Sequence, residues 1–238
     1  MKRISVYLIL SIFSVFVLNA ACVPYGGVKG NGKVAKEERS VENFKGIRVG
    51  GAFNVYLKQG DQVQLLVEAD ENLLPVIRTE VKSGVLVIST EEGIRNATKL
   101  NIYISCKTLE NLDVSGAAEI IGETPLRMNA LEIDASGASD IELEIEASRF
   151  HIDMSGAAEA EISGKASNMQ VDVSGASKLE ADELEVAVCN AEASGSSRVK
   201  LWVSEKLDVT ASGASSVDYT GDPLTNLKES GAADVDKK

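Results

Sequence analysis

The chain has 238 residues, with 36 acidic against 24 basic side chains and a formal charge of −12 at pH 7. This acidic balance excludes nucleic acid and anionic membrane surfaces as electrostatic partners. Aromatic residues make up 5% of the chain and there is one histidine, so rings for stacking and imidazoles for acid–base or metal chemistry are scarce.

Residues 1–21 have the pattern of an export signal. Two basic residues open the chain, and an apolar run over 6–18, too short to span a bilayer comfortably, is followed by two alanines before Cys22. Small residues directly before a cysteine resemble the lipobox of bacterial lipoproteins, although Asn19 stands where that motif prefers leucine. We therefore predict cleavage after residue 21 and lipid modification of Cys22. The alternative is an ordinary signal peptide with a free cysteine nearby.

Residues 22–45 are interpreted as a tether and lead-in. Without the signal, the chain from Cys22 has 217 residues and a formal charge of −14. The glycine-rich stretch 26–33 superficially resembles a phosphate-binding loop, but Val34 stands where that loop needs Ser or Thr, and no strand precedes it. The composition favours a flexible spacer.

A less regular strand region follows over 46–108. Residues 47–57 match the template of the later repeats with Gly50 in the place of the repeated serine. Alternating apolar patterns at 63–67, 85–88 and 100–104 indicate further strands. We expect longer coils or hairpins that open the fold.

A Ser-Gly pair then recurs at intervals of 18 to 21 residues. The seven copies begin at Ser115, Ser136, Ser155, Ser174, Ser194, Ser212 and Ser230. Self-similarity at a period near 20 residues is the signature of a solenoid. Seven equivalent serines cannot each be a poised nucleophile, so we interpret them as turn residues.

The flanks of each pair alternate between apolar and polar residues, which indicates strands. Counting the serine as zero, positions −3, −1 and +5 are mostly apolar, as in Ile133, Ala135 and Ile141. Glycine supplies the backbone angles of the turn between them. The sequence predicts an all-β fold, a right-handed parallel β-helix of about 18–21 residues per coil with three short sides, over residues 46–236. A polar final coil is expected to end the stack.

An acidic residue recurs at position −2. The column consists of Asp113, Asp134, Asp153, Asp172 and Glu192. A second short column at +4 contains Glu119, Asp140 and Glu159, followed by Lys178 and Arg198. Stacked carboxylates are weak candidates for calcium binding. A solvated acidic face that deters aggregation is the favoured interpretation, because no compact loop gathers enough oxygens, and no cofactor is expected.

Other chemistry-bearing residues are isolated. His151 falls on an outward position and is interpreted as an exposed surface residue, since no second histidine or catalytic arrangement accompanies it. Cys106 and Cys189 lack metal-ligand spacing and are expected to be buried free thiols. Trp202 and Tyr219 are the two aromatic platforms that the repeat region offers for a sugar, and a structural role is favoured for both.

The exported part resembles one known family. The segments GNGKV at 30–34, ERSVENFKGI at 38–47 and VYLKQGD at 55–61, together with the later Ser-Gly-Ala turns, are similar to the putative auto-transporter adhesin, head GIN domain. The resemblance covers about residues 30–235. It implies a β-helical cell-envelope protein of Gram-negative bacteria, usually lipid-anchored or exported, and it carries over no catalytic residue.

The leading functional hypothesis is a non-enzymatic envelope lipoprotein, an adhesin or interaction module whose partner is an envelope protein or a glycan. One rival is a polysaccharide-processing β-helix enzyme, for which Asp172, Lys178, Arg198 and Lys200 could be assembled. Another is a periplasmic structural or stress lipoprotein. Val23 after Cys22 favours an outer-membrane anchor. The next several residues hold no acidic cluster of the kind that tags surface export, which favours the periplasmic side, with the cell surface as the alternative.

Overall fold

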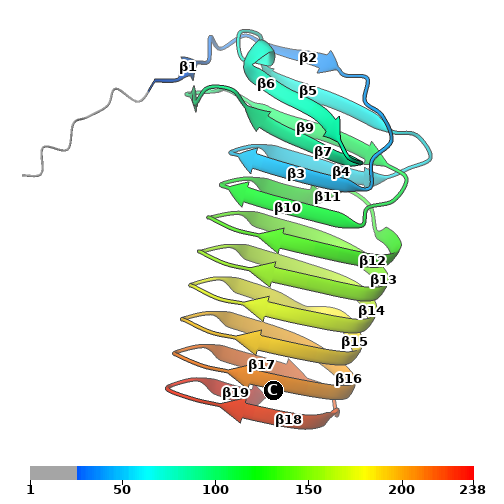
Figure 1. Ribbon diagram of the computed structural model, residues 1–238, viewed down its shortest axis with the longest axis vertical. Coiled ribbons are helices and arrows are strands. Elements are labelled where there is room, and N and C mark those ends of the chain that lie inside the picture. The colour runs from blue at the N-terminus through cyan, green and yellow to red at the C-terminus, as the bar shows by residue number, and fades with distance from the viewer. Residues whose placement is uncertain (1–25) are drawn as a thin grey trace, which may run out of the picture.

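The Ser-Gly repeat winds the chain into stacked β coils. The computed structural model describes residues 26–238, and Figure 1 shows the coils following one another along the long axis. Seventeen strands of the described residues belong to one continuous sheet. Those of the repeat region are β10 (Asn111–Gly116), β11 (Glu119–Gly122), β12 (Leu126–Ala135), β13 (Asp140–Met154), β14 (Glu159–Val173), β15 (Lys178–Ala193), β16 (Arg198–Ala211), β17 (Ser216–Thr220), β18 (Leu224–Glu229) and β19 (Asp234–Lys237). The predicted all-β solenoid is confirmed.

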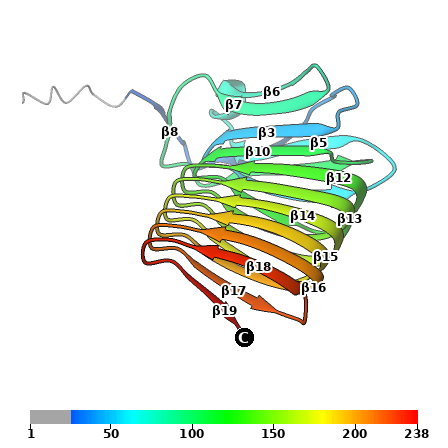
Figure 2. The same cartoon turned by 60° about the horizontal axis from the view of Figure 1, so that its bottom comes forward.

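Each regular coil is flattened into two arms, not the predicted three short sides. In β13, Ile141, Leu143 and Ile145 point inward with a period of two, and the inward phase then changes so that Phe150 and Ile152 are buried. That phase change bends the strand at one corner, at 148–149, without ending it. We call the part after a Ser-Gly turn the first arm and the part leading to the next turn the second arm. Figure 2 shows the two arms as the two layers of a flat coil.

The Ser-Gly turns are held in register by the backbone. Gly175 has φ +74°, and a Cβ there would lie 2.6 Å from the carbonyl oxygen of Gly156 on the preceding coil. The amide that follows Gly175, that of Ala176, donates to the same oxygen at 2.7 Å. The Ser174 hydroxyl donates to the carbonyl of Met154 at 3.3 Å. These contacts confirm the serines as turn residues and explain why glycine follows them.

The predicted copy at Gly50 is a true coil of the stack. Strand β3 (Gly46–Gly51) pairs in parallel with β10, with Gly50 opposite Ser115. Strand β4 (Asn54–Gln59) likewise pairs in parallel with β11. The template therefore identifies a coil that is separated from the next one by more than fifty residues of chain.

The intervening excursion builds the N-terminal end of the solenoid. Strands β7 (Val85–Thr90) and β9 (Leu100–Cys106) pair in parallel with β3 and β4 as a further coil. Two antiparallel strands then cover it, β6 (Ile77–Lys82) on β7 and β5 (Gln64–Asp70) on β9. We call this end of the solenoid, residues 60–110, the cap. The one helical element is the short 3-10 turn η1 (Leu74–Val76) within the described residues. The irregular opening predicted for this region is confirmed.

The expectation of a flexible spacer at 26–33 is wrong. Strand β1 (Val28–Lys29) pairs with β8 (Ile94–Arg95), and β2 (Val34–Glu38) pairs antiparallel with β5. Between them, the buried Asp70 carboxylate accepts hydrogen bonds from the amides of Gly32 at 2.9 Å and Thr98 at 3.1 Å. The Gly32 amide is the main cause that lowers the pKa of Asp70. The lead-in is therefore fastened to the cap.

One apolar core fills the space between the two arms from cap to last coil. Cys106 and Cys189 lie in it as free thiols, as predicted, and burial raises their pKa values to about 11 and about 12. At the far end, β18 is exposed along its length, with Leu224 79% exposed. The C-terminal end of the described stack (Figure 1) is therefore an exposed coil in which Leu224 and Leu227 stand beside the polar residues predicted there.

The predicted export signal at 1–21 and the lipidation site Cys22 lie outside the described residues. Within residues 26–238, no helix is long and apolar enough to cross a bilayer.

Candidate functional site

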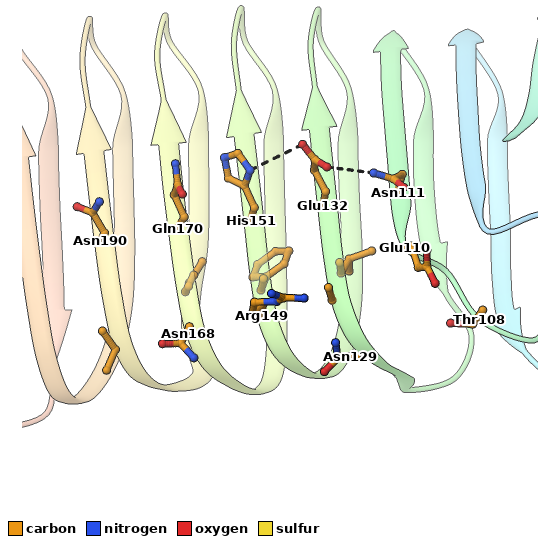
Figure 3. Close-up of a pocket in the computed structure, with 15 residues that line it drawn as sticks. Thr108, Glu110, Asn111, Asn129, Glu132, Arg149, His151, Asn168, Gln170 and Asn190 are labelled. Carbon is orange, nitrogen blue, oxygen red and sulfur yellow. Dashed lines mark hydrogen bonds and ion pairs between the residues drawn. The ribbon is translucent and has the colours of Figure 1, made fainter. Parts of the chain in front are cut away.

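A groove with a volume of about 770 Å³ runs across the outer face of the second arms, near the corner of the coils. It crosses from the segment 108–111 to the second arms of β12, β13, β14 and β15 (Figure 3). Five side-chain amides line it: Asn111, Asn129, Asn168, Gln170 and Asn190. The groove also contains Arg149 and His151, which can donate hydrogen bonds, and the carboxylates of Glu110 and Glu132, which accept them.

Parallel pairing places the polar groups of the groove in a straight column. Position −4 of successive coils is occupied in register by Asn111, Glu132, His151, Gln170, Asn190, Asp208 and Asn226. Neighbouring rungs lie about 4.8 Å apart, the spacing of paired strands. We call this column the amide ladder. The buried side chains of Leu131, Phe150 and Met169 lie beneath the amide ladder and support it.

Hydrogen bonds orient the upper rungs of the amide ladder. Asn111 donates from Nδ2 to Glu132 Oε2 at 3.1 Å, and Glu132 Oε1 lies 3.9 Å from His151 Nδ1. His151 Nε2 and Gln170 Nε2 each lie 3.0 Å from Asp172 Oδ2. Among the described residues, Asn190 has no such side-chain contact. The lower end of the groove therefore holds an amide whose donors and acceptor are open to a ligand.

The interpretation of His151 as an exposed surface residue needs correction. Its outward position is confirmed, but the side chain is 35% exposed and lies between two carboxylates, those of Glu132 and Asp172. These contacts hold the ring in the face of the groove, where it contributes to the polar surface.

The acidic column at position −2 forms as predicted. Asp113, Asp134, Asp153, Asp172 and Glu192 pair rung by rung, and Arg48 Nε closes the upper end at 2.6 Å from Asp113 Oδ2. Burial, followed by repulsion from Glu132, Asp113 and Asp153, raises the pKa of Asp134. Among the residues that the structure describes, no three His, Cys, Asp or Glu side chains are grouped so that they could hold a metal ion. The column is a charged face beside the groove.

The second charged column, on the first arms, is an ion-pair network. Lys178 Nζ lies 2.6 Å from Glu159 and 2.7 Å from Glu180, and Lys200 Nζ lies 2.6 Å from Glu180. These bonds raise the pKa of Lys178 and lower that of Glu180 to about 2. Asp172 belongs to the second arm, on the other face of the coil. The structure therefore does not bring together the four residues considered for a lyase.

Neither aromatic platform lines the groove. Tyr219 is 7% exposed and packs in the core, and Trp202, 39% exposed, lies on a first arm, next to Glu185 and Thr220 of the adjacent coils. The structural role expected of Tyr219 is confirmed.

The amide ladder escaped the sequence interpretation, although its signal is present there. Position −4 carries a side chain with hydrogen-bonding capacity in all seven rungs from Asn111 to Asn226. Position −4 does not form a recognisable motif along the chain, because its residues differ in type: amides, acids and a histidine. Only their common register turns them into one surface.

The family is decided by the sequence as a whole. The model of the putative auto-transporter adhesin, head GIN domain, matches residues 43–223. The chain belongs to this family. The amide ladder from Asn111 to Asp208 and the Ser-Gly turns from Ser115 to Ser212 lie within the matched segment of this head GIN domain. No curated protein matches the chain.

Solved structures share the fold of this head GIN domain. A putative adhesin from Bacteroides fragilis has a TM-score of 0.86 at 22% identity, over 89% of this chain and 100% of that one. A putative lipid binding protein from Parabacteroides distasonis has a TM-score of 0.73 at 22% identity, and a putative adhesin from the same species 0.71 at 24%. Each of these two alignments covers 90% of this chain and 100% of the other.

Proposed function

We propose that this head GIN domain is a non-enzymatic binding module of the cell envelope that holds an extended, polar glycan in the groove of the amide ladder. The observation that carries the proposal is the groove itself, which is lined by five side-chain amides and crosses five successive coils of one continuous sheet. Family membership and the adhesin names of the structural relatives support a surface or envelope role.

The chemistry of the groove suits sugars. A side-chain amide both donates and accepts, as a sugar hydroxyl does, so the amide side chains of the groove can pair with hydroxyls in either role. The rungs repeat about every 4.8 Å along the solenoid, which suits a ligand that itself repeats. Because the rungs stand on paired strands, little order has to be imposed on the protein when a ligand binds.

A protein partner would need a different surface. Protein interfaces gain most of their affinity from buried aromatic and apolar anchors. The large apolar side chains exposed in the described residues are Val34, Trp202, Leu224 and Leu227, and none of them lines the groove. The groove therefore favours a glycan over a protein.

The binding module is further proposed to be tethered by lipid on Cys22, in the outer membrane and facing the periplasm. Labelling cells with a radioactive fatty acid should mark the wild-type protein, and Cys22→Ala should abolish the label. Protease treatment of intact cells should spare the protein. Its removal would place the domain at the cell surface instead.

The test of glycan binding uses the full chain, purified with its anchor in detergent and screened against a panel of envelope and capsular oligosaccharides. The double variant Gln170→Ala, Asn190→Ala removes two rungs of the groove. At about 0.5–1.5 kcal/mol per hydrogen bond, affinity for a ligand found in the screen should fall roughly 5- to 150-fold. Asn226→Ala, a rung of the same ladder outside the groove, should leave it unchanged.

Two outcomes would overturn the proposal: no glycan bound across the panel, or a double variant that binds as well as the wild type. Release of shortened or unsaturated sugars during incubation would support the rival enzyme. The same incubation, analysed by mass spectrometry, therefore separates binding from turnover.

A further inference from the structure

We infer that Arg149 makes the groove selective for a saccharide that carries a carboxylate. This inference rests on the proposed function, because it names the class of glycan that the same groove holds. Arg149 lies at position −6, two residues before the ladder residue His151 on the same coil, and lines the groove with the amides (Figure 3).

The guanidinium of Arg149 is uncommitted. Within residues 26–238, Arg149 makes no side-chain hydrogen bond or ion pair, and it lies exposed in the groove. Both carboxylates of the groove have other partners than Arg149. Glu110 pairs with Lys45 at 2.7 Å, and Glu132 accepts the hydrogen bond from Asn111. The guanidinium of Arg149, which none of these carboxylates pairs with, is therefore available to an anion from outside the chain.

The neighbours of Arg149 complete a site for a planar anion. In the parallel register it stands between Ala130 on one coil and Asn168 on the next. Ala130 is small and leaves the flank of the guanidinium open, whereas Asn168 Nδ2, 3.4 Å from the Ser148 carbonyl, has a second hydrogen to donate. Arginine binds a carboxylate through two parallel hydrogen bonds, a geometry that lysine cannot reproduce.

The acidic column does not cancel this attraction. It lies four residues farther along the second arm, roughly 13 Å away at about 3.3 Å per residue. The Debye length at physiological salt is about 8 Å, so its charges are largely screened at Arg149. The arrangement also orients a ligand, with its carboxylate at position −6 and its hydroxyls on the amide ladder.

The test compares oligogalacturonate with the same oligosaccharide after chemical reduction of its carboxyl groups, by calorimetry on the full chain in detergent. The wild type should bind the acidic form at least tenfold more tightly. Arg149→Gln should remove that preference, since a charged hydrogen bond contributes about 1.5–3 kcal/mol, or roughly 10- to 150-fold. Its affinity for the reduced form should stay within twofold, and Arg149→Lys should restore part of the preference.

Arg127→Gln is the matched control. It removes one positive charge from the neighbouring coil, where Arg127 pairs with Glu146 at 2.8 Å outside the groove. The preference for the acidic form should survive it. Equal binding of both forms by the wild type, unchanged in Arg149→Gln, would overturn the inference and leave the proposed function standing. Binding of neither form, nor of any other glycan, would overturn both.

Discussion

At the scale of single residues, the solenoid is fixed by the glycine of each turn. Gly175 meets two requirements at once, a positive φ and a close contact of its backbone with the preceding coil. The serine before it contributes less to the turn: its hydroxyl donates one hydrogen bond to a carbonyl of the preceding coil. The turn therefore tolerates other residues at the serine position, as Gly50 shows, and depends on glycine at the next.

Replacing Gly175 by alanine should destabilise the solenoid more than the same change at Gly84. Both glycines have positive φ, which costs alanine about 1–2 kcal/mol. A Cβ at Gly175 also meets the Gly156 oxygen at 2.6 Å, whereas a Cβ at Gly84 meets nothing within 4 Å. Urea unfolding should show the larger loss for Gly175→Ala. Equal losses would mean that the coil contact is not a constraint.

Asp70 should make the attachment of the lead-in acid-sensitive. Hydrogen bonds in the folded chain, first of all from the Gly32 amide, lower its pKa below the ordinary value of 3.8. Its contribution to stability is therefore present above about pH 4 and is lost as the pH falls through the lowered pKa. Hydrogen exchange at Gly32 and Thr98 should accelerate in acid.

The variant Asp70→Asn should show fast exchange at those two amides already at neutral pH and no further step in acid. Asp61→Asn, which changes an exposed acid elsewhere in the cap, should behave as the wild type does. If exchange in the wild type is independent of pH after correction for the intrinsic rate, the carboxylate does not fasten the lead-in.

At the scale of elements, the coils differ in how many neighbours they have. Strands β13 to β15 are paired on both sides, whereas β18 and β19 are paired on one side in the described chain. Solenoid stability is a sum over such nearest-neighbour contacts, so it should decline toward the open end.

Hydrogen exchange should follow that order. Amides of β18 and β19 should exchange first, those of β16 and β17 next, and those of β13 to β15 last, near the global rate. The cap strand β5 should be protected, because it pairs with both β2 and β9. Uniform protection along all coils would indicate a single cooperative unit instead.

The coils could be predicted from the sequence, and the cap and the groove could not. A coil is set by a local pattern, alternating residues on either side of Ser-Gly, and this pattern located even the detached copy at Gly50. The cap depends on antiparallel pairings such as β2 on β5. The residue patterns of these segments indicate strands but do not indicate which strand pairs with which. The groove depends on side chains one coil apart, such as Arg149 and Asn168, which become neighbours only through register.

At the scale of the whole molecule, repulsion between stacked acidic side chains destabilises the solenoid. Like charges one rung apart repel by about 1 kcal/mol in water, and the acidic column has five of them in sequence. The ion pairs of Arg48 with Asp113 and of Lys178 with Glu159 offset a small part of this repulsion, because they are exposed and contribute at most about 1 kcal/mol each.

Salt should therefore stabilise the protein without preference among cations. Raising sodium chloride from 10 to 150 mM shortens the Debye length from about 30 to about 8 Å. This change should raise the melting temperature. Calcium at the same ionic strength should raise it equally. An extra rise with calcium, absent with magnesium, would revive the calcium site at the acidic column.

The coils also differ in length, and the structure accommodates the difference away from the turns. The register shifts lie on the first arm and at the corner, between Glu161 and Ser163 and between Ala181 and Val188, while the second arms stay paired rung by rung. Insertions at the corner thus leave the rungs of the amide ladder aligned. A duplication or deletion of one whole coil would join matching turns, so the reach of the groove can be lengthened or shortened in single genetic steps.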